Sequence, residues 1–201
     1  LDRLERDCER MALMGDKRMV LFSFVGDLFD GQDLSFAEDA IAIARDGLWH
    51  FDVLTKGGTR AYNSLPHFRP GGRFGTSLIW DNDVSRRGFE PGAAPVGDRL
   101  EAIREARRLG IYCWASVEPV IDEVQALNVI GMLGEAGCQE VRLGRRRGDN
   151  GVKWGEWCGE ALAVCRDLGL PYQIKSSLQP FWPDGVTTDT RPDTPAGSEE
   201  K

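Results

Sequence analysis

The sequence lacks any cysteine or histidine pattern typical of a metal site. Its five cysteines are scattered over 201 residues, and none of their spacings is a compact metal-binding motif (Cys8, Cys113, Cys138, Cys158 and Cys165). The two histidines, His50 and His67, are isolated from each other and from the cysteines. An odd number of scattered cysteines also argues against a disulfide framework and indicates a reducing compartment. We therefore expect a cytoplasmic protein whose own residues hold no metal.

Positive charge and long apolar runs are also scarce. The net charge is -7 and the pI is about 5.0, so we expect no global electrostatic attraction to nucleic acid or to a membrane. No apolar stretch is long enough to span a membrane, and no signal peptide is recognisable. The chain begins with Leu1 rather than Met and opens within a helical pattern, which favours a start inside a longer reading frame.

Strand-like and helix-like segments alternate along most of the chain. The apolar, β-forming segments are residues 19–25, 50–54, 73–80, the first part of 111–122, 140–143 and 172–175. The segments with helical periodicity include residues 1–15, 35–46, 123–136 and 153–168, and another precedes Gly110. This order predicts an α/β fold, a complete or partial parallel barrel over residues 1–179, with a doubly wound sheet as the competing topology. Residues 180–201 are rich in Pro, Thr, Asp and Gly and are predicted to be a disordered tail.

The most informative stretch of the sequence is I-Y-C-W-A-S-V-E-P-V-I-D, residues 111–122. Its first part is apolar, as expected for a buried parallel strand, and it then turns polar at Ser116 and Glu118. In a parallel α/β barrel, the chemistry takes place at the carboxyl ends of the strands. Glu118 is therefore a candidate site residue, with an ordinary exposed loop residue as the equally weighted alternative.

Polar or glycine-rich residues follow five of the six predicted strands. They are Gly26 and Asp27; Thr55, Lys56, Gly57 and Gly58; Asp81, Asn82 and Asp83; Ser116 and Glu118; and Gly144 with Arg145, Arg146 and Arg147. Each set alone would be typical of a solvated loop. In a barrel, however, the carboxyl ends of the strands meet on one face, so together these residues predict a single pocket.

Three of these features have alternative interpretations. The Thr55–Gly58 turn lets a ligand approach the backbone, but it lacks the spaced glycines of a phosphate-binding P-loop. The arginines between residues 142 and 147 could hold a phosphate, although a solvated basic loop is the favoured interpretation. Glu90, before Pro91, is either a ligand-facing carboxylate or the entry to a capped helix.

Five sequence motifs, taken together and in order, resemble one known family. They are T-K-G-G-T-R-A (55–61), F-G-T-S-L-I-W-D-N-D (74–83), E-P-G-A-A-P with R-L (90–100), G-I-Y-C-W-A-S-V-E-P-V-I-D (110–122) and Y-Q-I-K-S-S-L (172–178). In this order they resemble radical S-adenosylmethionine (radical SAM) proteins, in the branch similar to spore photoproduct lyase. The resemblance covers residues 19–178. It implies a partial (βα)6 barrel that binds a [4Fe–4S] cluster and S-adenosylmethionine and generates a 5′-deoxyadenosyl radical.

The resemblance also implies which residues approach the cofactor. Ser23, Gly26 and Asp27 correspond to the strand segment near the methionine moiety. Thr55 and Lys56 lie where the family approaches cofactor or substrate from the next strand. Ser116 and Glu118 occupy the S-x-E-P segment near the adenosyl group. The resemblance identifies no catalytic residue.

The chain departs from the family pattern at two places. The cluster motif, three cysteines with spacing three then two, is absent from all 201 residues. In the family this motif follows the first strand, so the chain resembles the family without its first βα unit. Relatives tend to have a lysine and an asparagine where this chain has Arg145, Arg146 and Arg147, so no role is carried over to that loop.

Three functional hypotheses follow. The leading one is the C-terminal part of a radical SAM enzyme, inactive alone and acting in full length on an unidentified substrate, with DNA or RNA as candidates. The second is a cluster-free barrel that binds a ligand or partner. The third is a phosphate-ligand enzyme that uses Glu118 and Lys56 as an acid–base pair. An unpaired edge strand at residues 19–25 also predicts self-association.

Overall fold

The computed structural model shows one sheet of six parallel strands. It describes residues 1–22, 26–31, 33–48, 50–68, 71–146 and 151–183. The strands are β1 (Val20–Phe22), β2 (Phe51–Thr55), β3 (Gly72–Ser77), β4 (Tyr112–Val120), β5 (Glu140–Arg145) and β6 (Tyr172–Ile174). They pair in the order β1-β2-β3-β4-β5-β6, so each strand lies beside its neighbours in the sequence. A doubly wound sheet would reverse its strand order part-way, so the structure excludes that alternative. The sheet is an open partial barrel.

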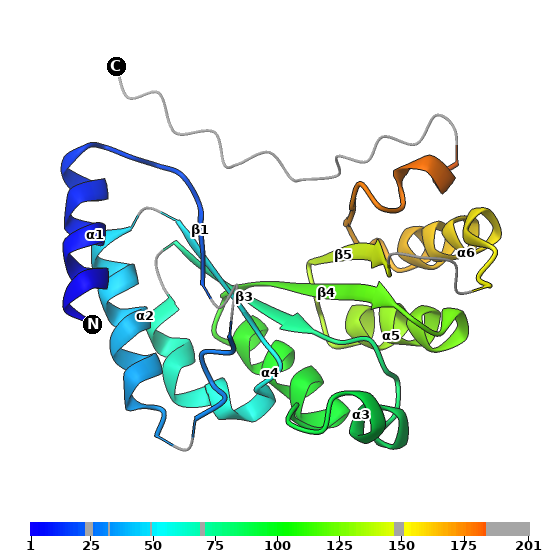
Figure 1. The fold of residues 1–201 in the computed structure, drawn as a ribbon, viewed down its shortest axis with the longest axis horizontal. Helices are drawn as coiled ribbons and strands as arrows, with labels where there is room; N and C mark the ends of the chain where they lie inside the picture. The colour runs from blue at the N-terminus through cyan, green and yellow to red at the C-terminus, as the bar shows by residue number, and fades with distance from the viewer. Residues whose placement is uncertain (23–25, 32, 49, 69–70, 147–150, 184–201) are drawn as a thin grey trace.

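Helices connect the strands and cover one side of the sheet. The α-helices are α1 (Asp2–Leu13), α2 (Ser35–Gly47), α3 (Asp83–Phe89), α4 (Val96–Arg108), α5 (Glu123–Glu135) and α6 (Trp154–Asp167). Two 3-10 helices, η1 (Gly58–Phe68) and η2 (Gln179–Phe181), complete the described structure. Figure 1 shows α2, α4 and α5 along one side of the sheet, with α1 next to α2. Helix α1 can approach closely because Gly47 has no side chain: a Cβ there would lie 2.5 Å from Cβ of Cys8.

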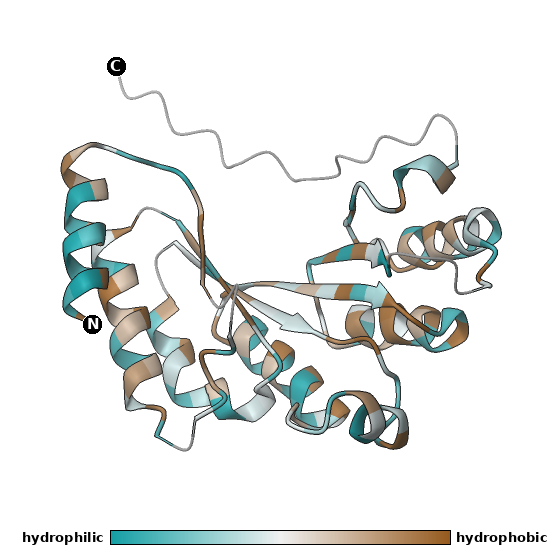
Figure 2. Cartoon of the chain, viewed as in Figure 1, coloured by the Kyte–Doolittle hydropathy of each residue, from teal (hydrophilic) through white to brown (hydrophobic). Residues whose placement is uncertain are grey.

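The two faces of the sheet differ in chemistry. Side chains of consecutive strand residues point to opposite faces, so Cys113, Ala115 and Val117 of β4 share the face that packs on the helices. These residues are completely buried in the hydrophobic core. We call this the helix face and the opposite side the inner face. The helices carry hydrophobic and hydrophilic residues in alternating bands, as expected for helices covering a sheet (Figure 2).

Several predicted boundaries need correction. The third predicted strand, residues 73–80, ends earlier, at Ser77, and residues 83–89 form α3, which was not predicted. Helix α2 begins at Ser35, as predicted, and the backbone N–H of Ser35 donates to the Asp33 carboxylate. Strand β5 extends to Arg145, beyond the predicted end at residue 143.

The chain after β6 is described only in part. Residues 184–201 of the predicted tail lie outside the described residues. Before them, η2 brings Trp182 onto Tyr172, with ring centroids 5.4 Å apart. None of the helices in the described part of the chain is long and apolar enough to span a membrane.

Candidate functional site

Asp27, in the segment that follows β1, binds the end of β2. Its carboxylate accepts hydrogen bonds from the Thr55 hydroxyl (2.6 Å), the Lys56 backbone N–H (2.6 Å) and the Phe29 backbone N–H (2.9 Å). Thr55 is buried, and its hydroxyl oxygen also accepts from the Gly57 N–H at 2.7 Å. Gly57 has to be glycine, because a Cβ there would lie 2.8 Å from Cβ of Phe29 and 2.9 Å from Oγ1 of Thr55. Asp27 and Thr55 therefore shape this turn by bonding to each other and to the backbone.

Lys56 presents a positive charge at the end of β2. Its ammonium group lies 2.6 Å from the Glu90 carboxylate. The lysine side chain is 44% exposed, whereas that of Glu90 is only 8% exposed. The Lys56 carbonyl accepts a hydrogen bond from the Ala94 N–H at 2.9 Å, so the loop between α3 and α4 is fixed against β2. Glu90 is thus the buried ion-pair partner of Lys56. The sequence alone could not decide between a ligand-facing carboxylate and the entry to a helix at this position.

Arg99 of α4 holds Glu90 from the other side. Its guanidinium lies 3.2 Å and 3.3 Å from Oε2 of Glu90, and it donates to the carbonyls of Ser77 (2.7 Å) and Ala94 (2.9 Å). Arg99 is completely buried. Burial lowers the pKa of Arg99, and the charge of Glu90 opposes that shift. The arginine connects the end of β3 to the Glu90–Ala94 loop.

A second lysine–glutamate pair lies at the ends of β4 and β6. Glu118, joined to Pro119 by a cis peptide bond, forms an ion pair with Lys175, which follows β6. Gly144 of β5 makes room for it: a Cβ at this position would lie 2.5 Å from Oε1 and 2.6 Å from Cδ of Glu118. Ser116, two residues earlier, is buried and pairs in register with Ser77 of β3. This pair therefore combines residues from three neighbouring strands.

The predicted site residues thus form two groups. Asp27, Thr55 and Lys56 lie together at the ends of β1 and β2, and Ser116 and Glu118 lie on β4. Gly26 is exposed beside Asp27, and Ser23 lies outside the described residues. Glu90, Arg99 and Lys175 were not predicted as cofactor contacts. A lysine directly after a strand, as at Lys175, was an available signal. Lys56 and Glu118, the acid–base pair of the third hypothesis, each form an ion pair with another residue rather than with each other.

The arginines near the end of β5 have different environments. The Arg145 guanidinium donates to the Ser177 carbonyl (2.7 Å) and lies over the rings of Trp154 and Phe181. Arg142 lies on the inner face, 3.5 Å from the ring centroid of Trp114. Arg146 is exposed, and Arg147 lies outside the described residues. Arg142 and Arg145 are thus engaged within the protein, which goes against one continuous phosphate-binding arginine cluster.

The inner face carries a buried network of charged residues that the sequence analysis missed. Asp52 of β2 binds Arg73 (2.5 Å and 2.6 Å) and lies 3.5 Å from Arg142. Arg142 also binds Glu140 at 2.6 Å, and Glu140 accepts a hydrogen bond from the Tyr112 hydroxyl at 3.3 Å. Charged residues alternating with apolar ones in F-D-V and E-V-R-L were the available signal, because alternation places them on one face. The network lies toward the amino ends of β3 and β4, whereas the candidate site lies at the carboxyl ends of the strands.

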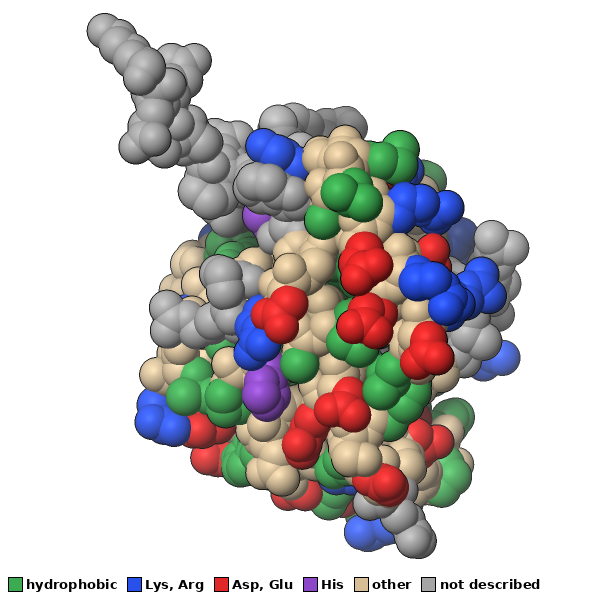
Figure 3. All heavy atoms as spheres, turned by 90° about the vertical axis from the view of Figure 1, so that its left-hand side faces the viewer, with side chains coloured by type: hydrophobic (Ala, Val, Ile, Leu, Met, Phe, Trp, Pro, Cys, Tyr) green, Lys and Arg blue, Asp and Glu red, His purple; other side chains and the backbone are tan. Residues whose placement is uncertain are grey.

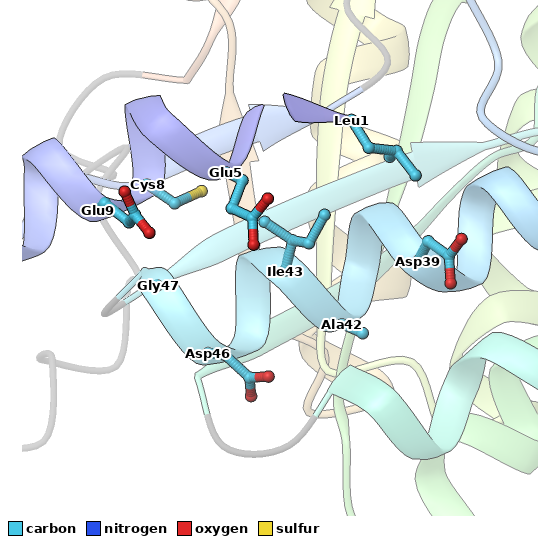
Figure 4. A pocket seen from close by; sticks show the side chains of 9 residues that line it. All are labelled: Leu1, Glu5, Cys8, Glu9, Asp39, Ala42, Ile43, Asp46 and Gly47. Carbon is cyan, nitrogen blue, oxygen red and sulfur yellow. The ribbon is translucent and has the colours of Figure 1, made fainter. Parts of the chain in front are cut away.

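A groove of about 490 Å³ lies elsewhere, on the outside of the barrel between α1 and α2 (Figure 4). Its lining includes the carboxylates of Glu5, Glu9, Asp39 and Asp46. Figure 3 shows acidic side chains gathered on this side of the molecule. The groove contains none of the residues at the strand ends, so it is separate from the candidate site.

The cysteines do not fit an iron–sulfur cluster. All five are free thiols and buried. Burial raises the pKa of Cys113, Cys138 and Cys165 to about 12, which disfavours the thiolate that binds iron. No group of three histidine, cysteine, aspartate or glutamate residues in the described part of the chain could hold a metal ion.

Comparisons with known proteins identify the fold. No protein-family model and no curated protein sequence matches the chain. Among solved structures, spore photoproduct lyase complexed with dinucleoside spore photoproduct matches with a TM-score of 0.66 and 13% identity, over 86% of this chain and 65% of that one. A spore photoproduct lyase variant with bound AdoMet matches with a TM-score of 0.61 and 16% identity, over 83% and 50%.

A second enzyme has the same architecture. Streptococcus suis SuiB bound to S-adenosylmethionine matches with a TM-score of 0.61 and 11% identity, over 91% of this chain and 46% of that one. The chain thus spans about half to two thirds of the length of these structures. Identities this low establish the fold alone. The chain has the partial-barrel fold of spore photoproduct lyase and SuiB. This shared fold supports the relationship to radical SAM enzymes that the sequence motifs predict.

Proposed function

We propose that this chain is part of a radical SAM enzyme and binds S-adenosylmethionine at the carboxyl ends of its strands. The observation that carries the proposal is the shared fold with spore photoproduct lyase and SuiB, both solved with this molecule bound. The polar groups at that edge suit the ligand. Lys56 offers a cation to its carboxylate, and the partly exposed Glu118 offers an acceptor to its ammonium group or ribose hydroxyls.

The remaining proposed contacts divide into two kinds. Asp27 and Thr55 shape the loop that presents Lys56, since their polar atoms bond to each other and to the backbone. We also propose cofactor contacts for Ser23, Gly26 and Ser116, on the strength of the family resemblance alone. A [4Fe–4S] cluster supplies the electron that cleaves S-adenosylmethionine in such enzymes. The five cysteines do not fit it, so the proposal requires cluster ligands from outside these 201 residues.

The fold leaves several substrate classes open. The structural neighbours were solved with a dinucleoside spore photoproduct and with the precursor peptide SuiA. Nucleic acid is therefore one candidate substrate and a peptide is another. With a net charge of -7, binding to DNA or RNA would depend on a local contact such as exposed Arg146.

Calorimetric titration with S-adenosylmethionine tests the ligand. We expect saturable binding that weakens about tenfold in Lys56→Met, because a charge-assisted hydrogen bond is lost. Lys153→Met is the matched control, because Lys153 is an exposed lysine that immediately precedes α6. Absence of binding by the wild-type chain would contradict the proposal for these residues.

Anaerobic reconstitution of the complete natural reading frame tests the enzyme. We expect iron–sulfur absorption and formation of 5′-deoxyadenosine from S-adenosylmethionine, and we expect neither from the 201-residue chain alone. A complete frame that binds S-adenosylmethionine without assembling a cluster would instead favour the second hypothesis, a cluster-free binding module. The buried cysteines are the observation that keeps this second candidate in view.

The edge strand β1 supports a further part of the proposal, which is self-association. Within the described residues, β1 pairs only with β2, and Met19, just before β1, and Leu21, within it, are exposed. An exposed strand edge is a template for pairing with another chain. Size-exclusion chromatography with light scattering should show dimers or larger species at high concentration. A monomer at all concentrations would rule this out.

A further inference from the structure

We propose that Glu90 and Arg99 are positioning residues that hold Lys56 at the carboxyl end of β2. Lys56 alone has a flexible four-carbon stem, and ordering it costs conformational entropy. The structure offsets that cost with a fixed carboxylate, 2.6 Å from the ammonium group. The positioning follows from the contacts themselves, whereas the use of Lys56 for a ligand rests on the proposed function.

Burial decreases stepwise along this chain of charges. Arg99 is completely buried, the Glu90 side chain is 8% exposed, and the Lys56 side chain is 44% exposed. Arg99 does not need Lys56, because it already donates to the carbonyls of Ser77 and Ala94 as well as to Glu90. Arg99 therefore fixes Glu90, and Glu90 in turn fixes Lys56. A buried charge is costly unless it is paired and hydrogen-bonded, and here both conditions are met.

The three residues together present one accessible positive charge. Two cations and one anion leave a net charge of +1, and Lys56 is the member that reaches solvent. The ammonium has three donors, so it can keep Glu90 and still bind an anionic group of a ligand. The arrangement suits a carboxylate or a phosphate. The need to fix Glu90 also explains why α4, on the outside of the barrel, places Arg99 in contact with the end of β3.

Amine acylation followed by peptide mass spectrometry tests the positioning without any ligand. Lys175 is the internal control, because it is also 44% exposed and also paired with a glutamate. We expect Glu90→Gln to speed acylation of Lys56 about tenfold while leaving Lys175 unchanged, since an amine must leave its carboxylate before it reacts. Arg99→Lys keeps the positive charge and changes no residue in contact with Lys56. It should also speed acylation of Lys56, because Glu90 is then held less firmly.

Other outcomes would overturn the inference. Unchanged acylation of Lys56 in both variants would show that the buried pair does not restrain it. Faster acylation of both Lys56 and Lys175 would show a general loosening of the fold rather than loss of the restraint on Lys56. Glu90→Gln is the milder substitution, so its result decides the inference if Arg99→Lys misfolds. If the wild-type chain binds no S-adenosylmethionine but the acylation pattern is as expected, the proposed function fails while the positioning stands.

Discussion

The two faces of the sheet are stabilised by different physical means. On the helix face, Phe74, Cys113 and Val141 are completely buried among apolar neighbours. On the inner face, the next residues along the same strands include Arg73, Glu140 and Arg142, which bury charge in pairs. Burial of apolar area is favourable wherever it occurs, whereas a buried charge is tolerated only with its partner in place. The helix face should therefore tolerate conservative changes, and the inner face should depend on complete pairs.

The largest effect is expected on the helix face. Phe74→Ala removes a completely buried ring that packs edge-on against Phe68, with centroids 5.8 Å apart. We expect the free energy of unfolding to fall by about 4 kcal/mol, from lost transfer energy and the cavity left behind. Urea unfolding followed by circular dichroism measures it.

The matched control is Phe36→Ala on α2. Phe36 is 56% exposed, so its removal should change the free energy of unfolding by less than about 0.5 kcal/mol. If the two variants were equally destabilised, the helix face would not be the apolar core described above.

The inner face should show the next largest effect. Asp52→Asn removes the carboxylate shared by Arg73 and Arg142, leaving two partly buried guanidinium groups short of a partner. We expect a loss of about 3 kcal/mol of unfolding free energy in the same urea experiment, at the lower end for a broken buried pair.

An exposed pair provides the control for this variant. Asp46→Asn breaks the ion pair with Arg45 on the surface of α2, and we expect no measurable change. Asp52→Asn behaving like Asp46→Asn would mean that the inner-face network contributes no stability, and the contrast between the faces would then be one of polarity alone.

The sequence predicted the helix face much better than the inner face. Alternating strand and helix segments and apolar runs indicated the parallel α/β order, because local periodicity reflects burial directly. The open sheet and its strand order required pairing between strands, which no local pattern specifies. Asp52 was missed because its arginine partners, Arg73 and Arg142, lie on other strands. Glu140 pairs with Arg142 of its own strand, so the alternation of charged and apolar residues there was a signal that the sequence did offer.

The candidate site was predictable only in outline. Polar residues after strands indicated which edge of the sheet to examine, because parallel strands end on one side. The pairing of Lys56 with Glu90 could not be predicted, since the two partners are 34 positions apart, with η1, β3 and α3 between them. Asp27 was predicted as a cofactor contact; in the structure, its hydrogen bonds go to the β2 turn, and whether it also contacts a ligand stays a prediction.

A smaller effect is expected where the inner face meets the strand ends. Gly144→Ala would bring a methyl group to within 2.5 Å of the Glu118 carboxylate, so Glu118 has to move from Lys175. We expect a loss of about 1–2 kcal/mol of unfolding free energy, typical of a modest steric overlap. In the Glu118→Ala background the same substitution should cost almost nothing. Equal costs in both backgrounds would place the clash elsewhere than at Glu118.

The smallest effect at neutral pH belongs to Tyr112, on the rim of the inner-face network. Burial, and then the Glu140 carboxylate, raise the pKa of Tyr112 to about 12, from about 10 in an unfolded chain. The folded protein therefore holds this proton more tightly than the unfolded chain does. The resulting stability is complete below pH 10 and is lost as the pH rises toward 12.

Tyr112→Phe isolates this contribution from the other groups that titrate at alkaline pH. We expect the variant to lose less unfolding free energy than the wild type between pH 10 and 12, because it has no phenol to ionise at this position. Tyrosinate absorbance near 295 nm should lose its most alkaline step in the variant. Parallel stability curves would mean that Tyr112 is solvated in the folded state, and the inner face would then bury its ion pairs without burying the tyrosine beside them.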